Sequence, residues 1–344
     1  MALRADRALA FRPDACLNAF RADYGCDICA TACPVAAIRP DGFGVALSDA
    51  CLECGQCAAA CPTGALSAPE PVAAAPRAAV ECARVPAAER TPGATVVACL
   101  GGLSTERLLE SCAEGAARLD IVDRGLCADC ALGGGRAEPW AEALAEARAL
   151  AAGVSAEALP GVVAMPAPRR PEPLRSDGVD PARRGLFRRL AAEPEAPSPW
   201  RRLGAAATPK RRRRLDALAR LDAAPAGAAP VVAVLEGCDL TGLCAAMCPT
   251  GALAFGVGED RAVLAFDAAR CIACGDCVAA CPTKAMALDP NGPPPGAEPA
   301  VLAERATRAC RKCETLFTPR AGEVVCPACV KSDDLMSEMS SLFP

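Results

Sequence analysis

Histidine is absent from the 344-residue chain, aromatic residues make up only 3% of it, and long apolar runs are missing. Without histidine there is no Rieske-type cluster ligation, no histidine ligand to zinc and no histidine general base. A membrane-spanning helix needs about 20 consecutive apolar residues, so we expect no membrane span. Residues 1–20 lack the apolar core and cleavage site of a secretory signal, which favours a cytoplasmic location.

Motifs for nucleotide binding and catalysis are also missing. The sequence has no GxxxxGK[ST] run and no GxGxxG run after an expected strand. It has no carboxylate pair or Ser-Lys arrangement at a catalytic spacing either. We therefore expect no catalysis by the chain alone, and we assign any catalysis to a partner.

Cysteine, in contrast, is abundant, with 24 residues. In a reducing compartment, cysteines in CxxC spacings indicate metal ligands rather than disulfides. They divide the chain into a first array at 11–68 and a second at 236–289, and the two arrays read as internal repeats. A chain of this length has room for two or three domains.

Each array contains one complete cysteine run. Residues 51–62 read CLECGQCAAACP and residues 271–282 read CIACGDCVAACP. This CxxCxxCxxxCP spacing resembles bacterial ferredoxins, in which three thiolates of a tight loop bind one cubane and the fourth faces the neighbouring cluster. The resemblance implies two dicluster ferredoxin modules.

The other cysteine-containing half of the first module lies upstream of its complete run. It reads GCDICATACP at 25–34, and a further cysteine precedes it. It resembles dicluster ferredoxins that carry an insertion between the first two ligands. The resemblance implies two [4Fe–4S] clusters, one held by Cys16, Cys26, Cys29 and Cys61, the other by Cys33, Cys51, Cys54 and Cys57.

The second module departs from the pattern at one position. In EGCDLTGLCAAMCPTGAL, residues 236–253, Thr241 stands where Cys274 stands in the complete run. One cluster then has only Cys238, Cys244 and Cys281, which implies either [3Fe–4S] or a [4Fe–4S] cluster with a non-cysteine ligand. The other [4Fe–4S] cluster keeps Cys248, Cys271, Cys274 and Cys277.

A small α/β unit is expected at 78–165. Strand-like segments at 78–81, 94–98 and 119–123 alternate with segments of helical spacing at 105–117 and 139–153. If the strands are parallel, four cysteines meet at their carboxyl edge, where open α/β sheets bind ligands. These are Cys82, Cys99, Cys127 and Cys130.

This pattern loosely resembles the iron–sulfur delta subunits of hydrogenases and heterodisulfide reductases, which implies a [2Fe–2S] cluster. The alternative is a set of reduced thiols or a CxxC dithiol. Cys112, one helical turn after Leu108, is expected in the core.

The tail carries two more CxxC knuckles within residues 305–332, namely Cys310, Cys313, Cys326 and Cys329. Four thiolates at this spacing close a tetrahedral site that zinc satisfies without redox chemistry. Mononuclear iron is the rival, because CPAC resembles rubredoxin. Glu314 and Val330 follow the knuckles where rubredoxins have glycine, which favours zinc.

Residues 166–228 are predicted to be a basic, proline-rich linker, since 169–220 carry 15 Arg or Lys against 6 Asp or Glu. The fold class is therefore α+β: two dicluster modules, a small α/β unit between them and a C-terminal zinc-ribbon-like knuckle pair.

The predicted function is electron transfer to or from a partner redox enzyme or another electron-transfer protein. One alternative is an accessory or maturation factor for an iron–sulfur or molybdenum enzyme, because PARRGLFRRLA at 181–191 resembles a segment of a ferredoxin that assists nitrate-reductase assembly. A nucleic-acid-binding regulator would use KRRRR at 210–214. The scarcity of aromatics and the overall acidity argue against nucleic acid as a partner.

Overall fold

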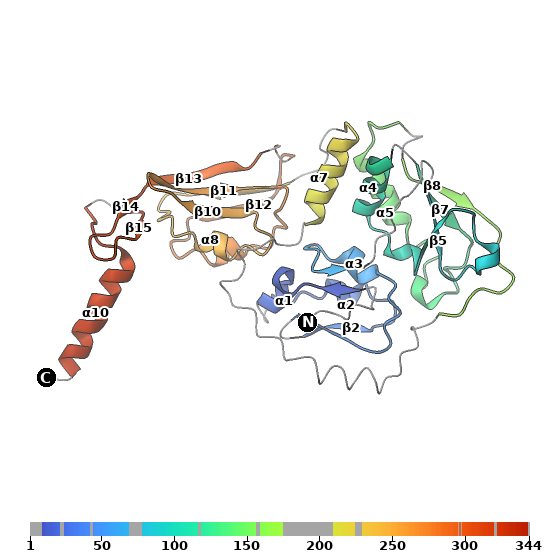
Figure 1. Cartoon of the computed structure of the whole chain (residues 1–344), viewed down its shortest axis with the longest axis horizontal. Helices are drawn as coiled ribbons and strands as arrows, with labels where there is room; N and C mark the ends of the chain where they lie inside the picture. The colour runs from blue at the N-terminus through green and yellow to red at the C-terminus, as the bar shows by residue number, and fades with distance from the viewer. Residues whose placement is uncertain are drawn as a thin grey trace. The chain divides into compact units, whose positions relative to one another are not determined.

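The computed structural model describes residues 9–20, 24–41, 44–68, 78–115, 118–155, 159–174, 209–223, 229–294, 296, 298–319 and 322–342. The chain divides into two units, Met1–Gly227 and Ala228–Pro344. Helices and strands are mixed in both, as the predicted α+β class requires (Figure 1). Within the described ranges, no helix combines the length and apolarity needed to cross a membrane.

The N-terminal part of the first unit consists of two short antiparallel pairs with helical turns between them. Strand β1 (Ala10–Phe11) pairs with β4 (Leu66–Ser67), so the two ends of the predicted module meet. Strand β2 (Ile38–Asp41) forms a hairpin with β3 (Gly44–Leu47) between the two cysteine halves. The helical segments are η1 (Pro13–Ala15), α1 (Leu17–Phe20), α2 (Ile28–Thr31) and α3 (Gln56–Ala60).

The α/β unit is a four-stranded sheet with all strands parallel, in the order β6-β5-β7-β8. The strands are β5 (Ala78–Cys82), β6 (Thr95–Val97), β7 (Leu119–Asp123) and β8 (Gly161–Ala164). The parallel direction of the three expected strands is confirmed, and β8 is an addition to them. Because the order reverses between β5 and β7, their carboxyl ends form a topological switch point, where such sheets bind ligands.

Helices α4 (Thr105–Gly115) and α5 (Ala141–Leu150) pack against this sheet (Figure 1). Ser104 precedes α4, and its Oγ accepts a hydrogen bond from the Arg107 backbone N–H at 3.2 Å, which satisfies one of the free donors of the first turn. Leu108 and Leu109 are fully buried. Short 3-10 turns, η3 (Ala87–Glu89), η4 (Leu100–Gly102) and η5 (Ala131–Gly133), connect the strands and helices.

The segment predicted to be a linker contains a helix among its described residues. Residues Lys210–Arg220 form α7, which packs on α4 and buries Ala217 and Leu218 in the α/β core (Figure 1). Arg213 and Arg214 of the KRRRR run form ion pairs with acidic residues of α4 and α5. PARRGLFRRLA lies outside the described residues.

The second unit repeats the pairing of the first and adds a strand. Strand β9 (Ala229–Val234) pairs with β12 (Met286–Gly292), and β10 (Leu253–Val257) pairs with β11 (Arg261–Phe266). Strand β13 (Ala300–Ala306) joins β11, so the sheet extends beyond the predicted end of the module at 289. The helices α8 (Leu243–Ala246) and α9 (Asp276–Ala279) start in the cysteine loops.

The C-terminal segment of this unit is a hairpin followed by a helix. Strand β14 (Arg308–Ala309) pairs with β15 (Leu316–Phe317), and α10 (Pro327–Leu342) leads away from them (Figure 1).

Candidate metal centres

The cysteines of the first array gather into the two predicted groups. We call the first group site 1; its members all line one small cavity and are Cys16, Cys26, Cys29 and Cys61. Burial raises the pKa of Cys29 to about 11, and the other three thiols add to the rise. Neighbouring buried thiols are costly to ionise together unless a cation lies among them, as it does when they ligate a metal cluster.

Asn18 explains how Cys16 reaches site 1 across the longer first gap. Its buried side chain clamps the backbone of Cys26: Nδ2 donates to the Cys26 carbonyl at 2.6 Å, and Oδ1 accepts from the Cys26 N–H at 2.9 Å. The segment that carries Cys16 is thereby tied to the second ligand. Nothing in the sequence pattern pointed to Asn18.

Site 2 consists of Cys33, Cys51, Cys54 and Cys57. Burial raises the pKa of Cys57 to about 12, and the three other thiols of the site add to that rise. Backbone N–H groups donate to two of these sulfurs, from Glu53 to Cys51 at 3.4 Å and from Ala37 to Cys33 at 3.2 Å. Such bonds stabilise a thiolate and are one means by which a protein sets a cluster's potential.

The second unit contains two further groups, each around its own small cavity. Site 3 is lined by Cys238, Thr241, Cys244 and Cys281. Site 4 is lined by Cys248, Cys271, Cys274 and Cys277. Burial raises the pKa of Cys274 to about 12 and that of Cys277 to about 11, in both cases with contributions from the neighbouring thiols Cys248 and Cys271.

The loop around Thr241 has the conformation of a cysteine loop. Leu240 and Gly242, on either side of it, have φ of 54° and 74°. Ala273 and Gly275, on either side of Cys274, have φ of 57° and 79°. A left-handed residue other than glycine is uncommon and strained, so its presence at both Leu240 and Ala273 shows that the two loops share one conformation although only one of them carries a thiol. Thr241 therefore occupies the second ligand position of site 3.

The cysteines of the α/β unit follow three parallel strands, as predicted. We call them site 5: Cys82, Cys99, Cys127 and Cys130. Cys82 ends β5, Cys99 follows β6, and the CxxC pair follows β7. Burial raises the pKa of Cys99 to about 12, and the thiols of Cys54 in site 2 and of Cys82 and Cys127 in site 5 add to the rise. The structure thus brings the thiols into one neighbourhood at the switch point.

One local hydrogen bond recurs at both predicted and candidate ligands. The backbone N–H two residues after a cysteine donates to its sulfur at 3.3–3.5 Å, and in the described residues this occurs at Cys51, Cys82, Cys99, Cys271 and Cys310. Two members of site 5 therefore share the backbone arrangement of the ferredoxin and knuckle ligands.

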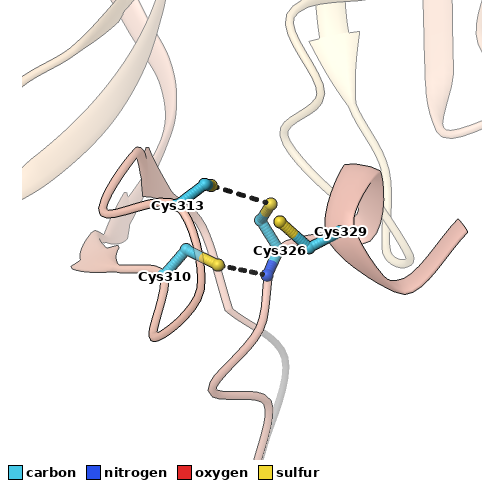
Figure 2. A group of neighbouring side chains, drawn as sticks. All are labelled: Cys310, Cys313, Cys326 and Cys329. Atoms are coloured by element: carbon cyan, nitrogen blue, oxygen red, sulfur yellow. Dashed lines mark hydrogen bonds between the residues drawn. The ribbon is translucent and has the colours of Figure 1, made fainter. Parts of the chain in front are cut away.

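The knuckle cysteines form site 6: Cys310, Cys313, Cys326 and Cys329. Figure 2 shows them converging from a loop and from the start of α10. Their sulfurs all lie within 4.8 Å of one another, and Cys313 Sγ is 3.7 Å from Cys326 Sγ. Four sulfurs about 2.3 Å from one zinc ion are separated by about 3.8 Å, so the spacing fits a single tetrahedral ion.

Backbone N–H groups stabilise the thiolate form of Cys310 in site 6. The N–H of Cys326 donates to Cys310 Sγ at 3.2 Å (Figure 2). The N–H of Lys312 donates to the same sulfur at 3.4 Å. These bonds, that from Cys326 first, lower the pKa of Cys310 to about 6. Since the thiolate is the metal-binding form, these hydrogen bonds favour metal binding at Cys310.

The sulfur atoms of sites 1 to 5 are spaced farther apart than those of site 6. Among the described residues, site 6 is the one group of three or more Cys, Asp or Glu side chains whose ligand atoms all lie within 4.8 Å. Wider groups of thiols suit clusters of several irons, in which each thiolate binds its own iron.

Comparison with known families identifies two of these regions. Residues 24–66 match a model of the 4Fe-4S dicluster domain, and residues 237–285 match a second such model. The chain therefore contains two 4Fe-4S dicluster domains of the ferredoxin type. Its two dicluster domains hold sites 1 to 4, although Cys16 lies before the first matched segment. No curated protein matches the chain, so the resemblance to delta subunits stays a prediction.

Proposed function

We propose that this protein is a cytoplasmic electron carrier that relays single electrons to or from a partner redox enzyme or a second electron-transfer protein. The observation that carries the proposal is the pair of dicluster domains, each with two groups of thiols in ferredoxin-type loops. Iron–sulfur clusters supply one-electron chemistry over a range of about −700 to +450 mV, tuned by hydrogen bonds to sulfur, burial and charge.

In this proposal sites 1, 2 and 4 each hold a [4Fe–4S] cluster through four thiolates. Site 3 holds either [3Fe–4S] or a [4Fe–4S] cluster whose fourth iron has a non-cysteine ligand. Site 5 holds a [2Fe–2S] cluster, and site 6 holds zinc, with mononuclear iron as the rival metal. The protein's own contribution is to bury the thiols, to aim backbone N–H groups at them and to fix the loops.

The test is a redox titration of anaerobically purified protein, followed by EPR. We expect dithionite to reduce several clusters and a one-electron acceptor to reoxidise them, with iron and sulfide recovered unchanged. A Cys57→Ser variant should lose the signal of site 2, while Cys112→Ser, which alters a buried thiol outside all six sites, should match the wild type. Iron that is bound but cannot be cycled would contradict a carrier function.

A maturation factor is the alternative, and it rests on the resemblance of residues 181–191 to the ferredoxin that assists nitrate-reductase assembly. The two functions differ in the partner bound. A maturation factor should retain the apo form of an iron–sulfur or molybdenum enzyme in a pulldown and release it once mature, whereas an electron carrier should bind the mature enzyme.

A further inference from the structure

The first dicluster domain and the α/β unit touch at their metal sites, and both belong to the first unit of the chain. The turn after Cys99 packs on the loop of site 2. Gly102 lies so close to the carbonyl oxygen of Cys54 that a Cβ on it would be 2.4 Å away. A glycine is needed here because neither backbone can rotate out of the contact.

Gln56 spans the same contact with its side chain. It lies between the site 2 ligands Cys54 and Cys57, and only 4% of its surface is exposed. Its Nε2 donates to Cys99 Sγ of site 5 at 3.7 Å and to the Leu132 carbonyl oxygen at 2.6 Å.

The orientation of the Gln56 amide is fixed by a third partner. Arg136 Nη2 donates to Gln56 Oε1 at 2.7 Å, and Arg136 Nε donates to the Gly133 carbonyl at 3.2 Å. A flipped amide would turn its own N–H groups towards the guanidinium, which can only donate. The N–H group must therefore face the sulfur of Cys99.

The complete cysteine run of the second dicluster domain has a different residue at the matching position. There Asp276 stands between Cys274 and Cys277, and its side chain is buried. A carboxylate only accepts hydrogen bonds, so it cannot donate to a thiolate as Gln56 does. Of the two complete cysteine runs, only that of the first dicluster domain therefore carries the amide at this position.

We propose that Gln56 and the Gly101–Gly102 turn form an electron route between the cluster of site 2 and an iron–sulfur cluster held by site 5. This inference rests on the proposed carrier function and adds a path to it. One electron moves: the site 2 cluster is oxidised from [4Fe–4S]1+ to [4Fe–4S]2+ while the site 5 cluster gains that electron, or the reverse. No proton or bond is transferred. Gln56 and Gly102 are positioning residues, since they set the contact rather than bind iron.

The first experiment asks whether site 5 holds a cluster. Cys99→Ser should lower the iron content of the anaerobically reconstituted full chain by about two irons and remove one EPR species. Cys112→Ser is the matched control for loss of a buried thiol in the same unit. Unchanged iron in Cys99→Ser, with the dicluster signals intact, would overturn the inference while leaving the proposed function standing.

The second experiment asks whether the two clusters are in contact. In fully reduced protein, a neighbouring [4Fe–4S] cluster speeds the spin relaxation of the site 5 cluster. The microwave power that half-saturates the site 5 signal should fall several-fold in Gly102→Ala. It should stay unchanged in Gly153→Ala, where an added Cβ meets nothing within 4 Å. Equal values in all three proteins would overturn the route.

The third experiment remains informative if Gly102→Ala does not fold. Gln56→Leu replaces the amide with an apolar side chain of similar size and removes the hydrogen bond to Cys99, so the midpoint potential of the site 5 cluster should move to a more negative value. Asp276→Asn, at the matching position, should leave that potential unchanged. A site 5 potential equal in Gln56→Leu and wild type would contradict the role assigned to Gln56.

Discussion

At the scale of single residues, threonine recurs beside the cluster ligands. The hydroxyls of Thr63, Thr250 and Thr283 lie 3.5–3.8 Å from the sulfur of the cysteine two residues before each of them. A ligating cysteine has lost its proton, so the hydroxyl must be the donor. The fourth CP segment has Val35 at this position and cannot make the bond.

Removal of one such hydroxyl should shift the midpoint potential of the cluster bound by the neighbouring cysteine. We predict that Thr63→Val lowers the midpoint potential of the site 1 cluster by roughly 20–60 mV, the equivalent of a net hydrogen bond of about 0.5–1.5 kcal/mol for one electron. Thr63→Ser keeps the hydroxyl and should stay close to wild type. Redox titration followed by EPR measures both, and an unshifted site 1 potential in Thr63→Val would contradict donation to the cluster.

Thr241 provides a second residue-scale prediction. Its loop matches that of Cys274, but a hydroxyl is a poor iron ligand, because ionising it costs far more than ionising a thiol of pKa about 8.5. The iron at this corner should be labile. Mild oxidation should give the EPR signal of an oxidised [3Fe–4S] cluster from site 3, and Thr241→Cys should suppress it. Indistinguishable spectra from the two oxidised proteins would mean that another ligand completes a stable [4Fe–4S] cluster.

The grouping of the cysteines could be predicted from the sequence because cluster geometry constrains the spacing of cysteines along the chain. The side chains that orient the ligands could not. Asn18 and Gln56 act across gaps of 8 and 43 residues, and an amide at such a distance leaves no periodic signal. The one hint was the difference between Gln56 and Asp276 in otherwise similar runs.

At the scale of elements, α7 is held to the α/β unit by charge as well as by its apolar side. Arg214 Nε donates to Glu106 Oε1 at 2.5 Å, and Arg213 forms two bonds with Glu110 at 2.6 and 2.7 Å. The Lys210 ammonium donates to the Ala59 carbonyl of the first dicluster domain. Burial alone would raise the pKa of Glu106, but Lys210 and Arg214 outweigh it, so the pKa lies below its usual range.

A carboxyl with a lowered pKa stabilises the fold fully above its unfolded pKa and loses this contribution as the pH falls through its folded pKa. We therefore predict that Glu106→Gln, which mimics protonation, destabilises the docking of α7 by about 1–3 kcal/mol at pH 7. Amide exchange at residues 210–220 should accelerate, while β5 and β7 keep their protection. Asp216→Asn, which removes an exposed pair with Arg212, should have little effect. Equal exchange in Glu106→Gln and wild type would rule out this role.

The three strands and two helices between residues 78 and 153 could be predicted because the spacing of apolar residues in each segment is typical of a strand or of a helix. The structure has all five at the expected places. Strand β8 (GVVA) and strand β13 (AVLAERA) show no alternation of apolar and polar residues, and β13 also follows a Pro- and Gly-rich segment, so neither was recognised as a strand. The apolar side of α7 is narrow, and five consecutive basic residues dominate its composition. Its acidic partners lie more than 60 residues away.

At the scale of the whole molecule, the hydrophobic cores of the domains differ in the types of side chain they bury. The buried cluster of the first dicluster domain includes four cysteines among ten residues, whereas that of the α/β unit contains Leu, Ile, Val, Trp and Ala and no cysteine. The buried cluster of the second dicluster domain contains one cysteine, and five further cysteines pack against it. Iron binding is therefore expected to supply much of the folding free energy of both dicluster domains. Chelation or oxygen exposure should unfold residues 11–68 and 236–289 before the α/β sheet. Hydrogen exchange that leaves both segments fully protected in apo protein would contradict this order.

The metal content of the whole chain follows from the cysteine sets. Sites 1 to 4 use 15 cysteines, site 5 and site 6 use four each, and of the 24 cysteines only Cys112, which is buried, remains. Anaerobically purified protein should then contain roughly 14–18 iron and about one zinc per chain. Paired Cys326→Ser and Cys329→Ser substitutions should remove the zinc and leave the iron, because site 6 shares no ligand with the other sites. Fewer than about 8 iron after full reconstitution would contradict two loaded dicluster domains, and iron in place of zinc at site 6 would identify that site as rubredoxin-like.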